Sequence, residues 1–167
     1  MRFAYADPPY IGQAKKHYHC KEVNHTELLL ELHREYPDGW ALSCSSPSLK
    51  IILPWCPSSC RVMAWVKPFC SFKPNVNPAY AWEPVIVYGG RKKERAQPTI
   101  RDFVSANITL KKGVHGAKPK QFWFWLFDVL GIQQSDELVD LFPGTGNGSI
   151  YLEEYKKQTE VPNSSQG

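Results

Sequence analysis

Short apolar segments alternate along this chain with segments that carry the residue spacing of helices. Strands that alternate with helices pair mostly in parallel, because each helix returns the chain along one face of the sheet. The sequence therefore predicts an α/β fold in which helices flank both faces of a mostly parallel sheet. The expected strands are residues 3–6, 40–44, 61–66, 84–88 and 138–142, and the expected helices are 26–36, 47–53, 119–130 and a last one ending at 157.

Local signals mark the ends of the predicted helices. Asn24 followed three residues later by Glu27 resembles a capping box, and the leucines that follow form the buried stripe of a helix. Pro119 suits a first helical position, and Gly131 is typical of the residue that closes a helix. The aromatic run over 122–127 predicts a helix that is buried all round or that forms a dimer face.

Length and composition restrict the class of protein. The chain has 167 residues, of which 43% are hydrophobic and 22% charged, which excludes a largely disordered protein. No apolar run approaches the ~20 residues that span a bilayer. The N-terminal segment carries charge where a signal peptide needs a long apolar stretch. We expect one domain over residues 1–160, a disordered tail over 161–167, a cytoplasmic location and no membrane contact.

The five cysteines predict no metal centre. An odd number of cysteines is typical of reduced thiols in a cytosolic chain. Cys56 and Cys60 are one residue further apart than the commonest zinc-knuckle spacing, and no second pair lies at matching spacing. His17, His19 and Cys20 are the conceivable partners of such a pair.

Positive charge is clustered along the chain, although the formal net charge is only +4. Such clusters suit a polyanionic partner, and solvated lysines on loops are the alternative interpretation. The loop from Ile11 to Asn24 combines lysines with aromatic side chains, which suits contact with a base and its phosphates. The expected nucleic-acid-binding residues are Lys15, Lys16, Tyr18, Lys67, Arg91, Lys92 and Lys93.

The first chemical motif, Asp7-Pro8-Pro9-Tyr10, directly follows a predicted strand. The exocyclic amine of a base is a poor nucleophile because its lone pair is delocalised into the ring. A carboxylate and a backbone carbonyl that accept both amine hydrogens localise that lone pair. Pro9 removes a competing N–H, and a tyrosine ring can stack on a base. A strand-to-turn corner with a packed tyrosine is the alternative interpretation.

The second motif is the glycine-rich run Asp-Leu-Phe-Pro-Gly-Thr-Gly-Asn-Gly over residues 140–148. A glycine-rich turn between a strand and a helix lets the backbone approach a ligand and presents the first amides of the helix. A plain connection between a strand and a helix is the alternative. Both motifs follow strands, and ligands of open α/β sheets bind at the carboxyl ends of strands.

Together, these motifs resemble those of the amino-methyltransferases of nucleobases, which depend on S-adenosylmethionine (SAM). Asp-Pro-Pro-Tyr looks like the catalytic motif, and residues 140–146 look like the cofactor motif. The catalytic motif comes first, as in the permuted, beta-class-like DNA enzymes and in the RNA adenosine methyltransferases. Lys118-Pro119 matches the Lys-Pro of both groups, and residues 81–91 are similar to a family segment in which an acidic residue precedes an apolar strand. The resemblance implies a reduced Rossmann-like methyltransferase fold.

The same resemblance implies a role for each matching residue. Asp7 and the Pro8 carbonyl hold the target amine, Tyr10 stacks the base, and Lys118 meets the carboxylate of SAM. Catalysis is direct methyl transfer by positioning and desolvation, without a metal. The implied catalytic set is Asp7, Pro8, Pro9 and Tyr10, and the implied cofactor-binding set is Asp140, Phe142, Gly144, Thr145, Gly146, Asn147, Lys118 and Pro119.

The chain departs from the family pattern after the cofactor motif. The DNA enzymes continue into a second strand whose terminal acid grips the ribose hydroxyls. Only about twenty residues follow Gly146 here, and residues 155–159 do not read as a buried strand. We therefore expect a smaller sheet with one edge cut back. Asn147 or a residue elsewhere is left to contact the ribose, unless that contact is missing.

The predicted function is an adenine-N6 methyltransferase that acts on DNA with SAM as cofactor. N4 of cytosine and adenine in RNA are the alternatives within the same chemistry. An alternative of another class is a non-catalytic, nucleic-acid-binding relative of the family. A homodimer or a partner subunit fits each of these hypotheses.

Overall fold

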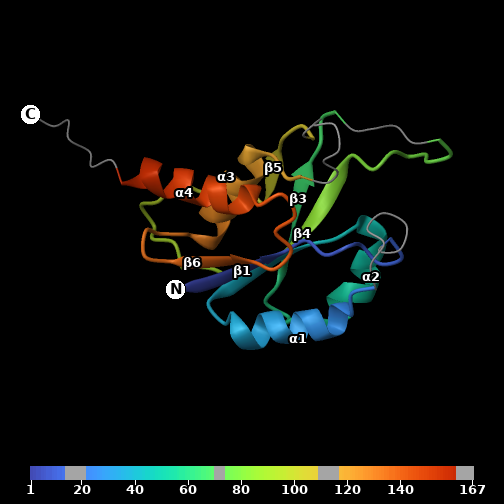
Figure 1. Ribbon diagram of the computed structural model, residues 1–167, viewed down its shortest axis with the longest axis horizontal. Coiled ribbons are helices and arrows are strands. Elements are labelled where there is room, and N and C mark those ends of the chain that lie inside the picture. Colours follow the sequence, from blue (N-terminus) through green and yellow to red (C-terminus); the bar gives the residue numbers. More distant parts are fainter. Residues whose placement is uncertain (14–21, 70–73, 109–116, 161–167) are drawn as a thin grey trace, which may run out of the picture.

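A six-stranded sheet forms the middle layer of the protein, and helices lie on both of its faces (Figure 1). The computed structural model describes residues 1–13, 22–69, 74–108 and 117–160. The strands lie in the order β5-β3-β4-β2-β1-β6. In chain order the elements are β1 (Arg2–Ala6), α1 (His25–Glu35), β2 (Gly39–Ser43), the 3-10 helix η2 (Ser46–Ser48), α2 (Leu49–Ile52), the 3-10 helix η3 (Leu53–Trp55), β3 (Arg61–Val66), β4 (Trp82–Gly89), β5 (Phe103–Ser105), α3 (Lys120–Leu130), β6 (Glu137–Asp140) and α4 (Asn147–Thr159).

All strands except β4 run in one direction. β1 pairs in parallel with β2 and with β6, and β3 pairs in parallel with β5. β4 is antiparallel to both of its neighbours, β2 and β3. The predicted α/β class with a mostly parallel sheet is therefore confirmed. We call the end of the sheet where the parallel strands finish its carboxyl end; β4 begins there because it runs the opposite way.

Each face of the sheet has its own core. Successive side chains of a strand point to opposite faces, so β1 contributes to both cores. Phe3 and Tyr5 pack with the aromatic side chains of α3 and with apolar residues of α4. Ala4 and Ala6 pack on the other face with the leucines of α1. Figure 1 shows this division, with α3 and α4 on one side of the sheet and α1 and α2 on the other.

Two helices follow their sequence signals closely. The Asn24 side chain accepts hydrogen bonds from the backbone N–H groups of Thr26 and Glu27, and so caps α1 as predicted. α3 ends at Gly131, which adopts the left-handed conformation that the C-cap prediction requires. The apolar residues of α3 are largely enclosed, which confirms a buried helix. The buried members are Phe122, Trp123, Trp125, Leu126, Phe127 and Leu130.

The structure corrects three details of the predicted elements. Pro119 has an extended ψ of 161° and is the N-cap of α3, whereas a first helical position was expected. The helix expected over 47–53 is divided into η2, α2 and η3, and Pro54 lacks the N–H that would continue the bonding of α2 into η3. β5 lies in a segment for which no strand was predicted, since three residues are too few to show a periodic pattern.

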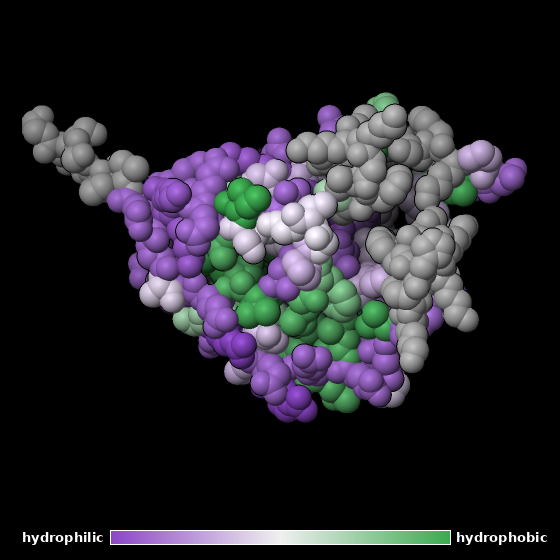
Figure 2. Space-filling view, in the orientation of Figure 1, coloured by the Kyte–Doolittle hydropathy of each residue, from purple (hydrophilic) through white to green (hydrophobic). Residues whose placement is uncertain are grey.

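β6 is an edge strand, which agrees with the expectation that the sheet is cut back beyond the cofactor motif. Within the described residues no strand pairs with its outer side, and the residues that follow form α4. Figure 2 shows hydrophobic residues gathered along this edge, between α4 and α1. Among the helices of the described ranges, none is long and apolar enough to cross a membrane.

Gly148→Ala is expected to lower the free energy of unfolding by about 1–3 kcal/mol, the usual cost of overpacking a core. A Cβ atom at Gly148 would lie 2.6 Å from Cη2 of Trp123. The Trp123 ring is buried and packs against Tyr5, with 4.8 Å between the two ring centroids, so it has little room to shift. Urea unfolding measures the loss, with Ser149→Ala as a neighbouring exposed control. Equal unfolding midpoints for the two variants would contradict this packing.

Candidate functional site

The two predicted motifs lie side by side at the carboxyl end of the sheet. β1 leads into Asp7 and β6 ends at Asp140, and the two strands are paired with Tyr5 opposite Asp140. The backbone N–H of Leu141 continues this pairing with a 2.9 Å bond to the carbonyl of Tyr5. The chain leaves β1 toward α1 on one face and leaves β6 toward α4 on the other (Figure 1). Such a switch point forms the crevice in which open α/β sheets bind ligands.

Asp7 forms a close ion pair with Lys118. Nζ of Lys118 lies 2.6 Å from Oδ2 of Asp7 and 3.2 Å from Oε2 of Glu83. The side chain of Lys118 is only 4% exposed, and its ammonium lies near the faces of the Trp65 and Phe122 rings. Burial acts to lower the pKa of Lys118, but the nearby acidic groups, Asp7 foremost, outweigh it and raise that pKa well above its usual value. The acidic surroundings thus favour the charged form of Lys118.

Glu83 joins this pair to two further side chains. Its carboxylate accepts a 2.5 Å bond from Nζ of Lys67 and a 2.7 Å bond from the phenol of Tyr10. Burial acts to raise the pKa of Glu83, but Lys118 and Lys67 outweigh it and lower the pKa to about 2. Negative and positive charges thus alternate in the cluster of Asp7, Lys118, Glu83 and Lys67. The hydroxyl group of Tyr10 is fixed by Glu83, which orients the ring.

Asp7 and Tyr10 have raised pKa values for the same reason. Burial raises the pKa of Asp7, and Lys118 offsets this only in part. Burial also raises the pKa of Tyr10 well above its usual value, so the phenol remains a hydrogen-bond donor. Asp7 is consequently a carboxylate with one oxygen held by Lys118 and a stronger than usual tendency to accept a proton.

A cavity of about 710 Å³ opens beside this cluster. Its wall includes Asp7, Pro8, Tyr10 and Lys118, together with the serines that follow β2. Tyr80 and Trp82 line it as well, although these rings are 54% and 40% exposed, respectively. A cavity of this size with aromatic walls and few convergent polar groups suits a flat small-molecule-sized group. The carboxylate makes it suited to a group that carries N–H donors.

The glycine-rich turn has the geometry of a ligand-binding backbone. Gly144 and Gly146 have φ values of +50° and +74°, which only glycine adopts freely, and the Gly146 N–H bonds the Pro143 carbonyl at 2.7 Å. Gly146 is the N-cap of α4, and no side chain caps that helix. The first amides of α4 are therefore available to an anionic or polar ligand group.

Asp140 lies at the base of this turn. Its Oδ1 accepts the backbone N–H of Phe142 at 3.1 Å. Burial raises its pKa to about 6; the Phe142 bond opposes this rise and the charge of Asp7 adds to it. A carboxylate in this position attracts a cationic group.

Asp140→Asn is expected to stabilise the protein at pH 8 by about 1 kcal/mol, because it removes the cost of keeping this carboxylate charged in the folded state. Each unit of pKa shift corresponds to about 1.4 kcal/mol, and the partial solvent exposure of Asp140 reduces the total. Asp140 has a higher pKa in the folded protein than its usual pKa of 3.8, so the folded state holds the proton more tightly. The stability of the wild type therefore falls as the pH rises from 3.8 to about 6. Asparagine keeps the acceptor for Phe142. The difference in Tm between the variant and the wild type should grow from pH 4 to pH 7, and a constant difference would contradict the assignment.

The structure places the predicted nucleic-acid-binding residues in different regions. Lys67 belongs to the charged cluster at the cavity. Arg91 follows β4 at the opposite end of the sheet, where it pairs with Asp136 at 2.7 Å, and its exposed neighbours Lys92 and Lys93 lie far from the cavity as a result. The predicted residues Lys15, Lys16 and Tyr18 lie outside the described residues.

The cysteines add no metal site within the described ranges. Cys44 is buried, and Cys56 and Cys60 are half-buried free thiols. In the portion of the chain that the structure describes, no group of three or more histidine, cysteine or acidic side chains could hold a metal ion. The conceivable partners His17, His19 and Cys20 lie outside that portion.

Several residues of the cavity were not singled out as site residues from the sequence. In the sequence, Glu83 is marked only as the acidic residue that precedes an apolar strand, as in the similar family segment. Tyr80 and Trp82 lie in or next to a proline-rich loop. Three aromatic or acidic residues within four positions, beside an apolar strand, were the available signal. Trp65, near the end of β3, is a buried core residue whose Nε1–H bonds the Ala106 carbonyl at 2.8 Å.

Comparison with known proteins relates this fold to solved structures. The chain is similar to M1.HpyAVI solved as a complex with SAM, at a TM-score of 0.61 and 14% identity over 92% of this chain and 78% of that chain. It is also similar to M1.HpyAVI solved alone, at a TM-score of 0.54 and 16% identity over 92% of this chain and 76% of that chain. No family model and no curated protein matches the sequence. The likeness therefore rests on the arrangement of the chain in space, and it establishes the fold.

Proposed function

We propose that this protein is a SAM-dependent methyltransferase that acts on the exocyclic amine of a nucleobase, with adenine N6 in DNA as the preferred target. One observation carries the proposal: the Asp7-Pro8-Pro9-Tyr10 motif and the glycine-rich turn lie side by side at the carboxyl end of adjacent strands. The likeness of the fold to a protein solved with SAM supports the choice of cofactor.

The residues around the glycine-rich turn fit SAM. The turn brings backbone close to a ligand through two left-handed glycines, and the uncapped amides of α4 suit polar groups of the cofactor. The partly buried carboxylate of Asp140 suits its positively charged amino group. Asn147 begins α4, and we assign it to a ribose hydroxyl of the cofactor. When bound, SAM supplies an electrophilic methyl group.

The cavity residues would prepare the amine. Lys118 holds Oδ2 of Asp7, which leaves Oδ1 of the same carboxylate to accept an amine hydrogen. The Pro8 carbonyl would accept the other hydrogen, so that the nitrogen lone pair is localised toward the methyl group. Tyr10, fixed by Glu83, would stack on the base. The methylated nitrogen must release one proton, and the raised pKa of Asp7 suits its carboxylate to receive it.

The contact between Lys118 and Asp7 also favours a second candidate function. An ammonium bonded to the carboxylate that should hold the amine is compatible with a non-catalytic, nucleic-acid-binding relative. In the catalytic hypothesis Lys118 positions Asp7, and its predicted contact with the carboxylate of SAM remains a proposal. Adenine in RNA and N4 of cytosine stay the alternatives within the methyltransferase hypothesis.

Isothermal titration with SAM tests the cofactor site and separates the two hypotheses. Gly144→Asp, which adds a charge to the turn, is expected to weaken SAM binding at least about tenfold, or 1.4 kcal/mol. Ser58→Asp is the control, because it adds the same charge at an exposed position shortly before β3, at the other end of the sheet. Wild-type protein that fails to bind SAM at millimolar concentration would contradict the enzyme and favour the non-catalytic relative.

A further inference from the structure

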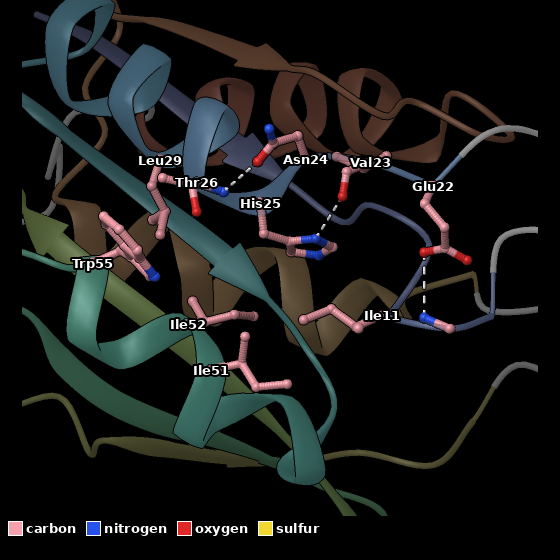
Figure 3. Close-up of a pocket in the computed structure, with 11 residues that line it drawn as sticks. Ile11, Glu22, Val23, Asn24, His25, Thr26, Leu29, Ile51, Ile52 and Trp55 are labelled. Carbon is pink, nitrogen blue, oxygen red and sulfur yellow. Dashed lines mark hydrogen bonds between the residues drawn. The ribbon is translucent and has the colours of Figure 1, made fainter.

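A second cavity, of about 370 Å³, lies next to the cavity that contains Asp7. Ile11 and Ile51 line both cavities, so the two spaces are neighbours. The second cavity, which we call the His25 cavity, is formed by the start of α1 and by α2 and η3, with Leu29, Ile52 and Trp55 among its apolar walls (Figure 3). Its volume and lining are those of a site for a small flat group.

His25 gives this cavity an unused hydrogen-bond acceptor. The side chain is 8% exposed, and its Nδ1 lies 3.0 Å from the carbonyl of Val23. A carbonyl only accepts, so Nδ1 carries the proton and Nε2 of the neutral ring presents a lone pair. Nε2 is buried and has no hydrogen-bond partner among the residues that the structure describes. Figure 3 shows the ring directed into the space bounded by Ile11, Ile51 and Ile52.

Trp55 supplies a stacking surface at the rim of the same cavity. Its ring is 61% exposed, and the neighbouring Ile51 is 50% exposed. Exposed aromatic rings beside an apolar slot stack readily on bases, because every base has a π-face. A buried acceptor without a partner also costs free energy, which a ligand N–H would recover.

We propose that the His25 cavity binds a second base of the nucleic-acid substrate, a neighbour of the target base. The base would stack on Trp55 and donate a hydrogen bond from its exocyclic amine to Nε2 of His25. Cytosine and adenine present such an amine, and thymine does not. The cavity thus selects an amine-bearing neighbour and contributes to sequence preference. This inference rests on the proposed function, because it assigns the adjacent Asp7 cavity to the target base.

Fluorescence anisotropy with labelled single-stranded DNA tests the inference on the full chain. Two probes are compared, a thymine tract with one central adenine and the same tract with cytosine on both sides of that adenine. The wild type is expected to bind the cytosine-flanked probe about fivefold more tightly, and His25→Leu is expected to lose that preference. Equal affinity of the wild type for both probes would overturn the assigned role of Nε2.

Trp55→Ala keeps the test decisive if His25→Leu does not fold, since Trp55 is largely exposed. It is expected to weaken binding of the cytosine-flanked probe about tenfold, because stacking contributes about 1–3 kcal/mol per base. Leu53→Ala is the matched control, from the same 3-10 helix but outside the cavity wall. Equal affinities for the Trp55→Ala and Leu53→Ala proteins would overturn the inference.

Titration of the same proteins with SAM distinguishes failure of the inference from failure of the proposed function. If the wild type does not bind SAM but its DNA binding depends on Trp55, the enzyme hypothesis is rejected and the second base site stands. SAM binding without any effect of Trp55 or His25 on DNA affinity would reject the second base site alone.

Discussion

Asp7→Asn is expected to lower the rate of methyl transfer by about 10²–10³-fold, the usual loss when one polar group that acts on the transition state is removed. The asparagine oxygen would stay with Nζ of Lys118, which bonds Oδ2 of Asp7 at 2.6 Å in the wild type. Its amide nitrogen, a donor, would then face the amine hydrogens of the base and repel them. The rate is measured by transfer of labelled methyl groups to DNA at saturating SAM.

Cofactor binding provides the control for this result. Asp7 contacts Lys118 and the base cavity, so the affinity of Asp7→Asn for SAM is expected to stay within about threefold of the wild type. Asp102→Asn removes a carboxylate from an exposed ion pair with Arg61 and should leave both quantities unchanged. An Asp7→Asn protein that methylates DNA at the wild-type rate would reject Asp7 as the group that holds the amine.

Lys118→Met is expected to cost about 3–5 kcal/mol of unfolding free energy at pH 8, as for a buried ion pair that loses one partner. The substitution leaves the carboxylates of Asp7 and Glu83 near each other, with Lys67 as the remaining cation at Glu83. In the wild type the pKa of Glu83 is lowered from its usual 4.5 to about 2. The stability that the charged Glu83 contributes is therefore complete above pH 4.5 and is lost as the pH falls toward 2.

Between pH 8 and pH 5, the stability of the variant should rise relative to that of the wild type. Without Lys118, only the smaller effect of Lys67 opposes the effect of burial on Asp7, so the pKa of Asp7 rises further and the folded state gains protons. The variant then gains stability relative to the wild type as pH falls. Lys120→Met, which removes a half-exposed ion pair with Glu154, is the control and should cost less than about 1 kcal/mol. Chemical unfolding at a series of pH values measures both proteins, and a similar small loss in each would reject the cluster as a buried unit.

The strands and the order of the motifs were predictable because local patterns determine them. β3 has the predicted bounds, Arg61–Val66, since apolar residues fill it between turn residues. α1 is capped by Asn24 as predicted and begins at His25, one residue before the expected start. Asp7 and Asp140 follow separate apolar runs, and parallel pairing of these runs is enough to bring the two motifs to the same end of the sheet.

The direction of β4 could not be read from the sequence, and it decides what the site contains. Because β4 is antiparallel, its first residues, Trp82 and Glu83, lie beside Lys67 at the carboxyl end. For the same reason Arg91, just after β4, lies at the other end. An apolar run indicates a strand and its burial, but the run looks the same in both directions. The partners of Glu83 depend on that pairing, so the charged cluster appeared only in three dimensions.

Mass spectrometry of nucleosides tests the central claim most directly. The full chain is incubated with SAM carrying a deuterated methyl group and with adenine-containing DNA, single-stranded and double-stranded, and the DNA is then digested. The account predicts deuterated N6-methyladenine with the wild type and its near absence with Asp7→Asn. Wild-type protein that binds SAM and DNA but forms no methylated base in DNA or in a matching RNA would contradict the proposed methyltransferase.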